Sequence, residues 1–136
     1  MATRAKVFKQ YATEIEFVVA AAGAATAGQG AKFGVDDGTV LNSVAGDTCF
    51  GVFMKTAAAG EKTRVCVGFV AIVSVKVGTG GVATRGLIAT VGTNGFTNAV
   101  LGGGTVGKNV AGMFLQSGVA GDDVSMGILP YTGVGP

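Results

Sequence analysis

The spacing most typical of ligand binding lies at residues 102–109, Gly-Gly-Gly-Thr-Val-Gly-Lys-Asn, which fits the Gly-x4-Gly-Lys pattern of a phosphate-binding loop. In such a loop a Ser or Thr follows the lysine and binds magnesium, and a helix begins there. Here Asn109 takes that position, and residues 110–116 have the pattern of a strand. We therefore predict a glycine-rich turn that binds no nucleotide or other cofactor.

Carboxylate pairs could bind calcium or exchange protons, and the chain has two of them, Asp36 with Asp37 and Asp122 with Asp123. Each pair adjoins a glycine, which is typical of a tight turn, and neither has the spacing of a calcium loop. We predict turns at both places and no metal site.

Cys49 and Cys66 are the two cysteines, and either could act as a nucleophile or the two could form a disulfide. The chain contains no histidine, which removes the commonest general base and metal ligand. Without a secretion signal, two cysteines are more often free, buried thiols. We predict structural cysteines and no enzymatic activity.

Basic and aromatic residues alternate near the start of the chain. Such an arm could be a solvated, frayed end, or it could dock on an acidic partner surface. We take five of its residues as candidates for contact with a partner protein: Arg4, Lys6, Phe8, Lys9 and Tyr11. The net charge of +2 is too small to indicate a nucleic-acid partner.

The composition fits one folded domain that positions these residues. Of the 136 residues, 49% are hydrophobic and 13% are charged, so the chain can bury a core, and its apolar surface favours an oligomer. The longest uncharged apolar run, 65–75, is too short for a membrane-spanning helix. Glu14 and Glu16 interrupt what could otherwise be a secretory signal, so we expect synthesis in the cytoplasm and no membrane partner.

Strands separated by glycine turns are predicted along the whole chain, because it has 25 glycines and two prolines. In residues 69–77 the apolar side chains alternate, with Ser74 and Lys76 predicted to point outward. Residues 18–27 are predicted to be a strand end followed by a loop. The predicted strands are 14–19, 48–54, 62–67, 69–77, 86–91 and 124–129.

An internal repeat appears at an offset of 61 residues. Residues 46–54 match 107–115, and the Ala-Gly-acidic run 59–61 matches 120–122. Each copy is predicted to be a hairpin with Phe53 or Phe114 in the core and the acidic residue at the turn. The matches fit either a duplication or convergent use of one turn design.

The predicted fold class is all-β, a small Gly-rich β-barrel or sandwich with two related hairpin units. We predict a single β domain at 14–129, between a flexible basic arm at 1–13 and a flexible tail at 130–136.

Several short motifs resemble a known family: Gly-Val-Phe at 51–53, Ala-Ala-Ala-Gly-Glu at 57–61, Val-Cys-Val-Gly-Phe at 65–69, and the closing unit 107–129. Over residues 14–129 the chain resembles the capsid cement, or head decoration, proteins of tailed bacteriophages, a group long filed as a domain of unknown function. The resemblance implies a β-rich, non-catalytic protein that binds the outer face of an expanded icosahedral shell, commonly as trimers, and stiffens it.

The sequence and the resemblance together predict a structural virion protein on the outer capsid surface, with the major capsid protein as its partner. A homo-oligomer is expected, and a trimer is favoured. The basic arm is the predicted coat contact. Alternatives are another phage β module, in a fibre, tail or surface array, and a sugar-binding β domain, which the absence of tryptophan disfavours.

Overall fold

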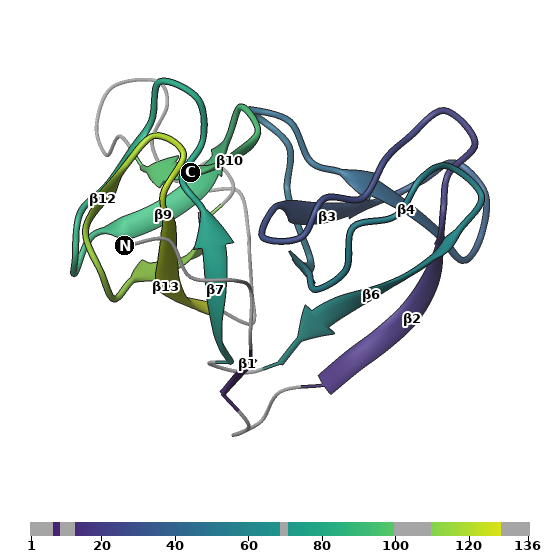
Figure 1. Ribbon diagram of the computed structural model, residues 1–136, viewed down its shortest axis with the longest axis horizontal. Helices are drawn as coiled ribbons and strands as arrows, with labels where there is room; N and C mark the ends of the chain where they lie inside the picture. The colour runs from purple at the N-terminus through teal and green to yellow at the C-terminus, as the bar shows by residue number, and fades with distance from the viewer. Residues whose placement is uncertain (1–6, 9–12, 69–70, 100–109, 129–136) are drawn as a thin grey trace.

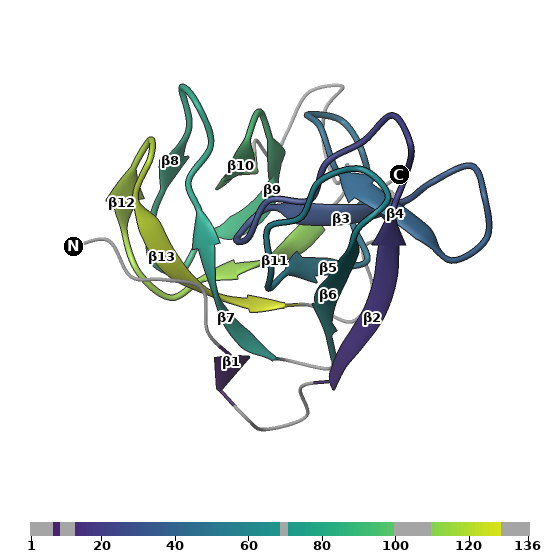
Figure 2. The ribbon, with the colours of Figure 1, turned by 45° about the vertical axis from the view of Figure 1, so that its right-hand side comes forward.

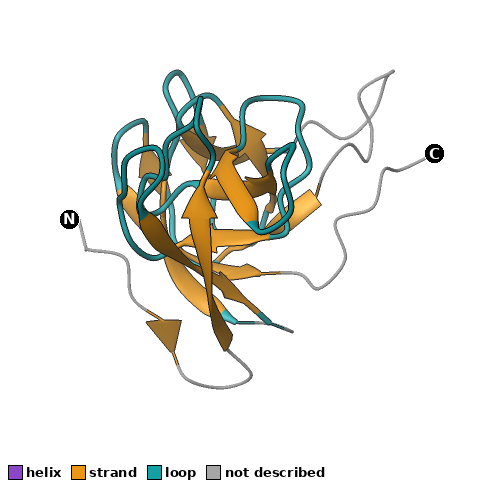
Figure 3. Ribbon diagram, turned by 90° about the vertical axis from the view of Figure 1, so that its right-hand side faces the viewer, coloured by secondary structure: helices purple, strands orange, loops and turns teal. Residues whose placement is uncertain are grey.

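The protein is all-β, as predicted. In a computed structural model, residues 7–8, 13–68, 71–99 and 110–128 are described, and they form thirteen strands (Figure 3). No helix among these residues is long and apolar enough to cross a membrane.

The first half of the chain is a closed five-stranded barrel, which we call the first barrel. Its sheet order is β2-β4-β3-β5-β6, and a parallel pair between β2 and β4 closes it. Alternate side chains point inward, and Val40, Phe53 and Val65 are fully buried in its core. The strands are β2 (Thr13–Val19), β3 (Gly30–Phe33), β4 (Thr39–Asn42), β5 (Gly51–Phe53) and β6 (Lys62–Val67).

The second half repeats this order, and we call it the second barrel. Its strands pair as β7-β13-β11-β9-β10, and a parallel bridge between Val77 and Phe96 brings β10 back to β7. The short β1 (Val7–Phe8) adds to the other edge of β7, and β8 (Val82–Ala83) pairs with β12 (Gly118–Val119). The five main strands are β7 (Ile72–Lys76), β9 (Ile88–Gly92), β10 (Gly95–Asn98), β11 (Val110–Phe114) and β13 (Asp123–Ile128).

The predicted hairpin repeat is confirmed, and both copies have the same register. Phe53 pairs with Val65 in the first barrel, and Phe114 pairs with Met126 in the second. Both phenylalanines are fully buried. Each hairpin turn has a glycine at positive φ, Gly60 at 81° and Gly121 at 90°, a conformation that side chains other than glycine rarely adopt.

The acidic residues that follow these glycines hold the two turns in the same way. The Glu61 carboxylate accepts a hydrogen bond from Ala58 N at 2.6 Å, and the Asp122 carboxylate accepts one from Val119 N at 3.0 Å. The sequence-based assignment of these acids to the turns is therefore confirmed.

The duplication extends beyond the hairpins to the whole barrel. The side chain of Asn42 accepts a hydrogen bond from Thr26 N at 2.9 Å and donates one to the Thr26 hydroxyl at 3.0 Å. Asn98 makes the same two bonds with Thr84, both at 2.9 Å. A repeated side-chain lock of this kind, together with the repeated strand order, favours duplication of a complete unit over convergent use of one turn.

The two barrels lie side by side, with β7 facing the first barrel (Figure 1). Although they have separate cores, three residues of the first barrel belong to the core of the second: Cys49, Val52 and Cys66. A backbone hydrogen bond from Lys76 N to Gly28 O, 2.9 Å long, also joins the two halves. The chain therefore folds as two barrels connected by an apolar contact.

Some elements differ from the prediction. The strands β1, β3, β4, β8, β10 and β12 were not predicted, because each is only two to four residues long. The prediction that Ser74 points outward into solvent is wrong, since it is only 5% exposed. Its strand β7 lies between the barrels, where the turn at Gly28 packs against the backbone of Lys76.

Candidate interaction surface

Most of the predicted contact arm lies outside the described residues: Arg4, Lys6, Lys9 and Tyr11. The exception is Phe8, which belongs to β1 and pairs with Ile72 of β7 (Figure 2). Two residues of the predicted arm thus belong to the sheet. The glycine-rich segment 102–109 also lies outside the described residues, and so does the predicted tail 130–136.

The described surface has a cluster of three aromatic side chains at one end of the first barrel, Phe17, Phe33 and Phe50, which we call the aromatic mouth. The rings of Phe33 and Phe50 are stacked, with centroids 4.1 Å apart and planes 3° apart. Phe17 meets Phe50 edge-on at 5.6 Å and Phe33 edge-on at 6.2 Å. Phe17 and Phe50 pack on the core below them, and Phe33 is 63% exposed.

Strand geometry explains this arrangement. On β3, Ala31 and Phe33 point to the same side, so the buried Ala31 begins a row that ends at the exposed Phe33. On β2, the same alternation takes Phe17 and Ile15 outward from the buried Val19. The rows of apolar side chains that fill the barrel therefore continue past its end into solvent.

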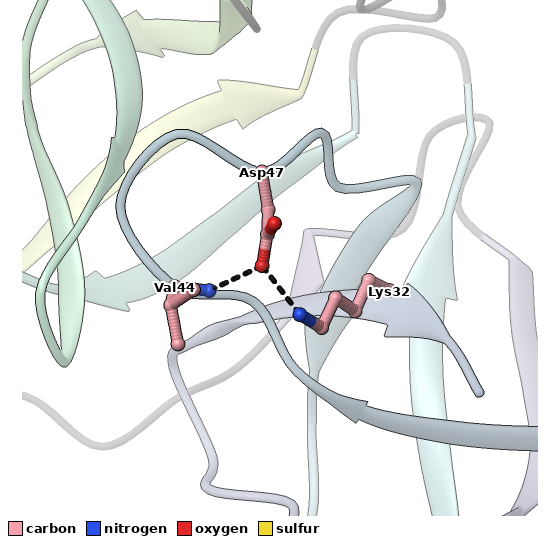
Figure 4. A network of polar contacts seen from close by, with 3 residues as sticks. All are labelled: Lys32, Val44 and Asp47. Carbon is pink, nitrogen blue, oxygen red and sulfur yellow. Dashed lines mark hydrogen bonds and ion pairs between the residues drawn. The ribbon is translucent and has the colours of Figure 1, made fainter. Parts of the chain in front are cut away.

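A partly exposed ion pair between Lys32 and Asp47 lies beside the aromatic mouth. The carboxylate of Asp47 accepts hydrogen bonds from Lys32 Nζ at 2.6 Å and from Val44 N at 2.9 Å (Figure 4). The Lys32 bond, then the Val44 bond, lower the pKa of Asp47 from its ordinary value. This pair fixes the 44–47 turn beside Phe50.

Phe33 stands between two hollows of the surface. One, of about 370 Å³, is lined by Asp47, Cys49 and Phe50, and the other, of about 510 Å³, is lined by Ala21, Val35 and Leu41. Lys32 and Phe33 line both. An exposed aromatic ring beside a mainly apolar hollow is a feature typical of protein contact sites.

The matching end of the second barrel is covered. The counterparts of the mouth phenylalanines, given by the repeated strand pairing, are the smaller residues Val75, Val91 and Ala111, and none is more than 4% exposed. They belong to the same core cluster as Cys49, Val52 and Cys66 of the first barrel. One barrel end is thus covered by protein, and the other is open.

The residues considered for chemistry have structural environments. Cys49 and Cys66 are buried thiols that form no disulfide, as predicted, and desolvation raises the pKa of their thiols to about 12 and about 11. Asp123 forms an ion pair with Lys76 at 2.9 Å. Among the described residues, no three His, Cys, Asp or Glu side chains come together as metal ligands.

Sequence reasoning missed the aromatic mouth. Phe17, Phe33 and Phe50 are far apart in the chain; Phe17 and Phe50 have the local pattern of core residues in predicted strands, and Phe33 lies in a strand that was not predicted. The signal that could have found them is the repeat, once it is extended to the earlier strands, because the same positions hold smaller side chains in the second copy.

The fold defined by these observations is a tandem of two related five-stranded barrels. No protein-family model matches the chain, and no curated protein matches its sequence. Its structure is similar to the crystal structure of the head fiber gp8.5 N base in bacteriophage phi29, with a TM-score of 0.68 and 17% sequence identity. The similarity covers 88% of this chain and 98% of that chain, so a phage structural protein has the same fold over almost its whole length.

Proposed function

We propose that this chain is a structural component of a phage virion, which binds the outer surface of the icosahedral capsid and stabilises it by bridging coat subunits. The observation that carries the proposal is the likeness, over nearly the whole chain, to the base of a phage head fiber. The resemblance of the sequence motifs to capsid cement proteins supports the same site of action. The proposed partner is the major capsid protein, and the proposed oligomer is a trimer.

The described residues fit a binding role without catalysis. Both thiols are buried, the acidic pairs lie in turns or ion pairs, and the exposed feature is an apolar aromatic surface. Many copies of one small contact, repeated by capsid symmetry, give a strong combined attachment. The basic arm, Arg4 to Tyr11, stays the predicted coat contact.

A second candidate is a fibre component, which is favoured because the similar structure is the base of a head fiber. The two candidates differ in copy number and in what projects from the shell. A cement protein occupies all equivalent positions and raises the temperature at which the shell opens. A fibre base occupies its own set of positions and carries a projecting element.

The test is co-sedimentation of the purified chain with expanded capsids of its source phage, followed by electron microscopy of the pellet. We expect binding that saturates at a fixed number of copies per shell, and loss of binding when residues 1–11 are removed. Binding that survives the deletion would move the contact to the barrels. A chain that stays in the supernatant at every concentration would overturn the capsid proposal.

A further inference from the structure

The two barrels of one chain meet through unlike faces. Strand alternation points Val52 and Cys66 away from the first core, since their neighbours Phe53 and Val65 point into it. With Cys49 and the partly buried Met54, they form a surface that we call the first wall, and all four pack on the core of the second barrel. The wall of one barrel therefore covers the end of the other.

The second barrel has the same wall, and its two largest side chains are exposed, while Val110 is half-buried and Gly127 is buried. The counterparts of the four residues, which we call the second wall, are Val110, Met113, Leu115 and Gly127. Met113 is 40% exposed and Leu115 is 39% exposed. Both are apolar, as are the residues they correspond to. Among the described residues, the exposed side chains of the second wall and the aromatic mouth are thus the counterparts of the two surfaces that join the barrels.

The sizes of the two open surfaces are complementary. The aromatic mouth has phenylalanines where the covered end has Val75, Val91 and Ala111. The second wall has Gly127 where the first wall has Cys66, and a Cβ atom at Gly127 would have nothing within 4 Å. The mouth thus has larger side chains, and the second wall a smaller residue, than the two surfaces that meet within the chain.

We propose that the second wall of another copy of this chain covers the aromatic mouth, repeating between chains the contact that joins the barrels within one chain. A contact between unlike faces is heterologous, so it closes into a ring when its rotation allows and otherwise continues as an open chain of copies. The proposal does not depend on capsid binding.

The edge of the proposed contact between copies differs from the edge of the contact between the two barrels of one chain. In the second barrel, the short turn 93–94 lets Lys76 N bond to Gly28 O of the neighbouring barrel. In the first barrel, the longer loop 34–38 supplies this bond internally, from Val18 N to Gly38 O, and exposes Val35 beside the mouth. The contact between copies is thus more apolar and has one backbone hydrogen bond fewer.

The test measures mass in solution by analytical ultracentrifugation, without capsids. Three variants are compared with the unmodified chain: Phe33→Glu in the mouth, Met113→Glu in the second wall, and Val82→Glu as a control. The three side chains are all exposed, between 40% and 63%, so circular dichroism and thermal melts should match the unmodified chain. Each variant adds the same charge.

We expect the unmodified chain and Val82→Glu to associate, and both Phe33→Glu and Met113→Glu to stay monomeric. An equimolar mixture of the two monomeric variants should form a dimer and no larger species, because the mixture contains one intact mouth and one intact wall per pair. Three results would each overturn the proposal: a monomeric unmodified chain, association of Met113→Glu like the unmodified chain, or no association in the mixture.

Discussion

The close approach of β11 and β13 predicts a large difference between two neighbouring glycine-to-alanine substitutions. A Cβ atom at Gly112 would meet the carbonyl oxygen of Gly127 on the paired strand far inside contact distance. That oxygen belongs to the backbone and cannot turn aside, so the strands must separate locally. We expect Gly112→Ala to lower the free energy of unfolding by about 1–3 kcal/mol, the usual cost of overpacking.

The control is Gly127→Ala on the other strand of the same pair, where a Cβ atom meets nothing within 4 Å. This variant should change stability by less than about 1 kcal/mol, and the less flexible unfolded chain favours a small gain. The same experiment can be done in the first barrel, because a Cβ atom at Gly51 would lie 2.5 Å from the backbone oxygen of Cys66. Gly51→Ala should therefore cost about as much as Gly112→Ala.

The assay is unfolding in urea followed by far-ultraviolet circular dichroism, with the midpoint and the slope fitted for each variant. Typical domains have only about 5–15 kcal/mol of stability, so the expected loss is a large fraction of the whole. Equal losses of unfolding free energy for Gly112→Ala and Gly127→Ala would refute the reasoning, because they would mean that a Cβ atom is crowded at both positions of the β11–β13 pair.

Three further predictions concern side chains. Cys49 and Cys66 should resist iodoacetamide in the folded protein at pH 8 and react after unfolding, because burial raises the pKa of their thiols to about 12 and about 11 and thiolates are the reactive form; rapid labelling of the native chain, followed by mass spectrometry, would contradict this. Asp47→Asn should cost about 0.5–1.5 kcal/mol at neutral pH, since the variant loses the charged bond to Lys32. The pKa of Asp47 is lowered in the fold, so this stability is present above the ordinary carboxyl pKa and is lost as the pH falls through the lowered value. The free energies of unfolding of the unmodified chain and of Asp47→Asn should therefore become equal in acid. A difference in free energy that stays constant at all pH values would exclude the charge as its cause. Asn42→Ala and Asn98→Ala should each cost about 0.5–1.5 kcal/mol in thermal or urea unfolding, because each removes the side-chain hydrogen bonds to Thr26 or Thr84. A loss in one barrel alone would show that the two locks are not equivalent.

The part of the fold that the sequence predicts is the part where side chains match across the repeat. Phe53 and Phe114, with the Gly-acidic turns after them, identify both hairpins, because these positions need the same residue types in both copies. The remaining strands were not predicted, because their residue types and spacing do not match between the two copies. The loop 34–38 is longer than the turn 93–94, so the two copies do not keep a constant offset. In addition, β3 and β10 are four residues long and each begins with a glycine, so neither has a strong strand pattern.

The aromatic mouth could not be recognised from local pattern, because an exposed row and a buried row of apolar side chains look alike in a strand. Phe33 is exposed because no other barrel of the described chain covers this end of the first barrel, whereas the first barrel covers the matching end of the second. Val75 and Val91 share one core cluster with Cys49 and Cys66, which are distant in the chain. The exposed row of the first barrel and the buried row of the second therefore differ only in whether another barrel packs on them.

The sharing of core residues between the barrels has a consequence for the order of folding. The first barrel closes with strands from residues 13–67 alone, so it can form while the second half of the chain is still being synthesised. The second barrel completes its core only on a surface that contains Cys49, Val52 and Cys66. We therefore expect the first barrel to act as a template for the second, because its wall of apolar side chains can be folded before the second barrel forms.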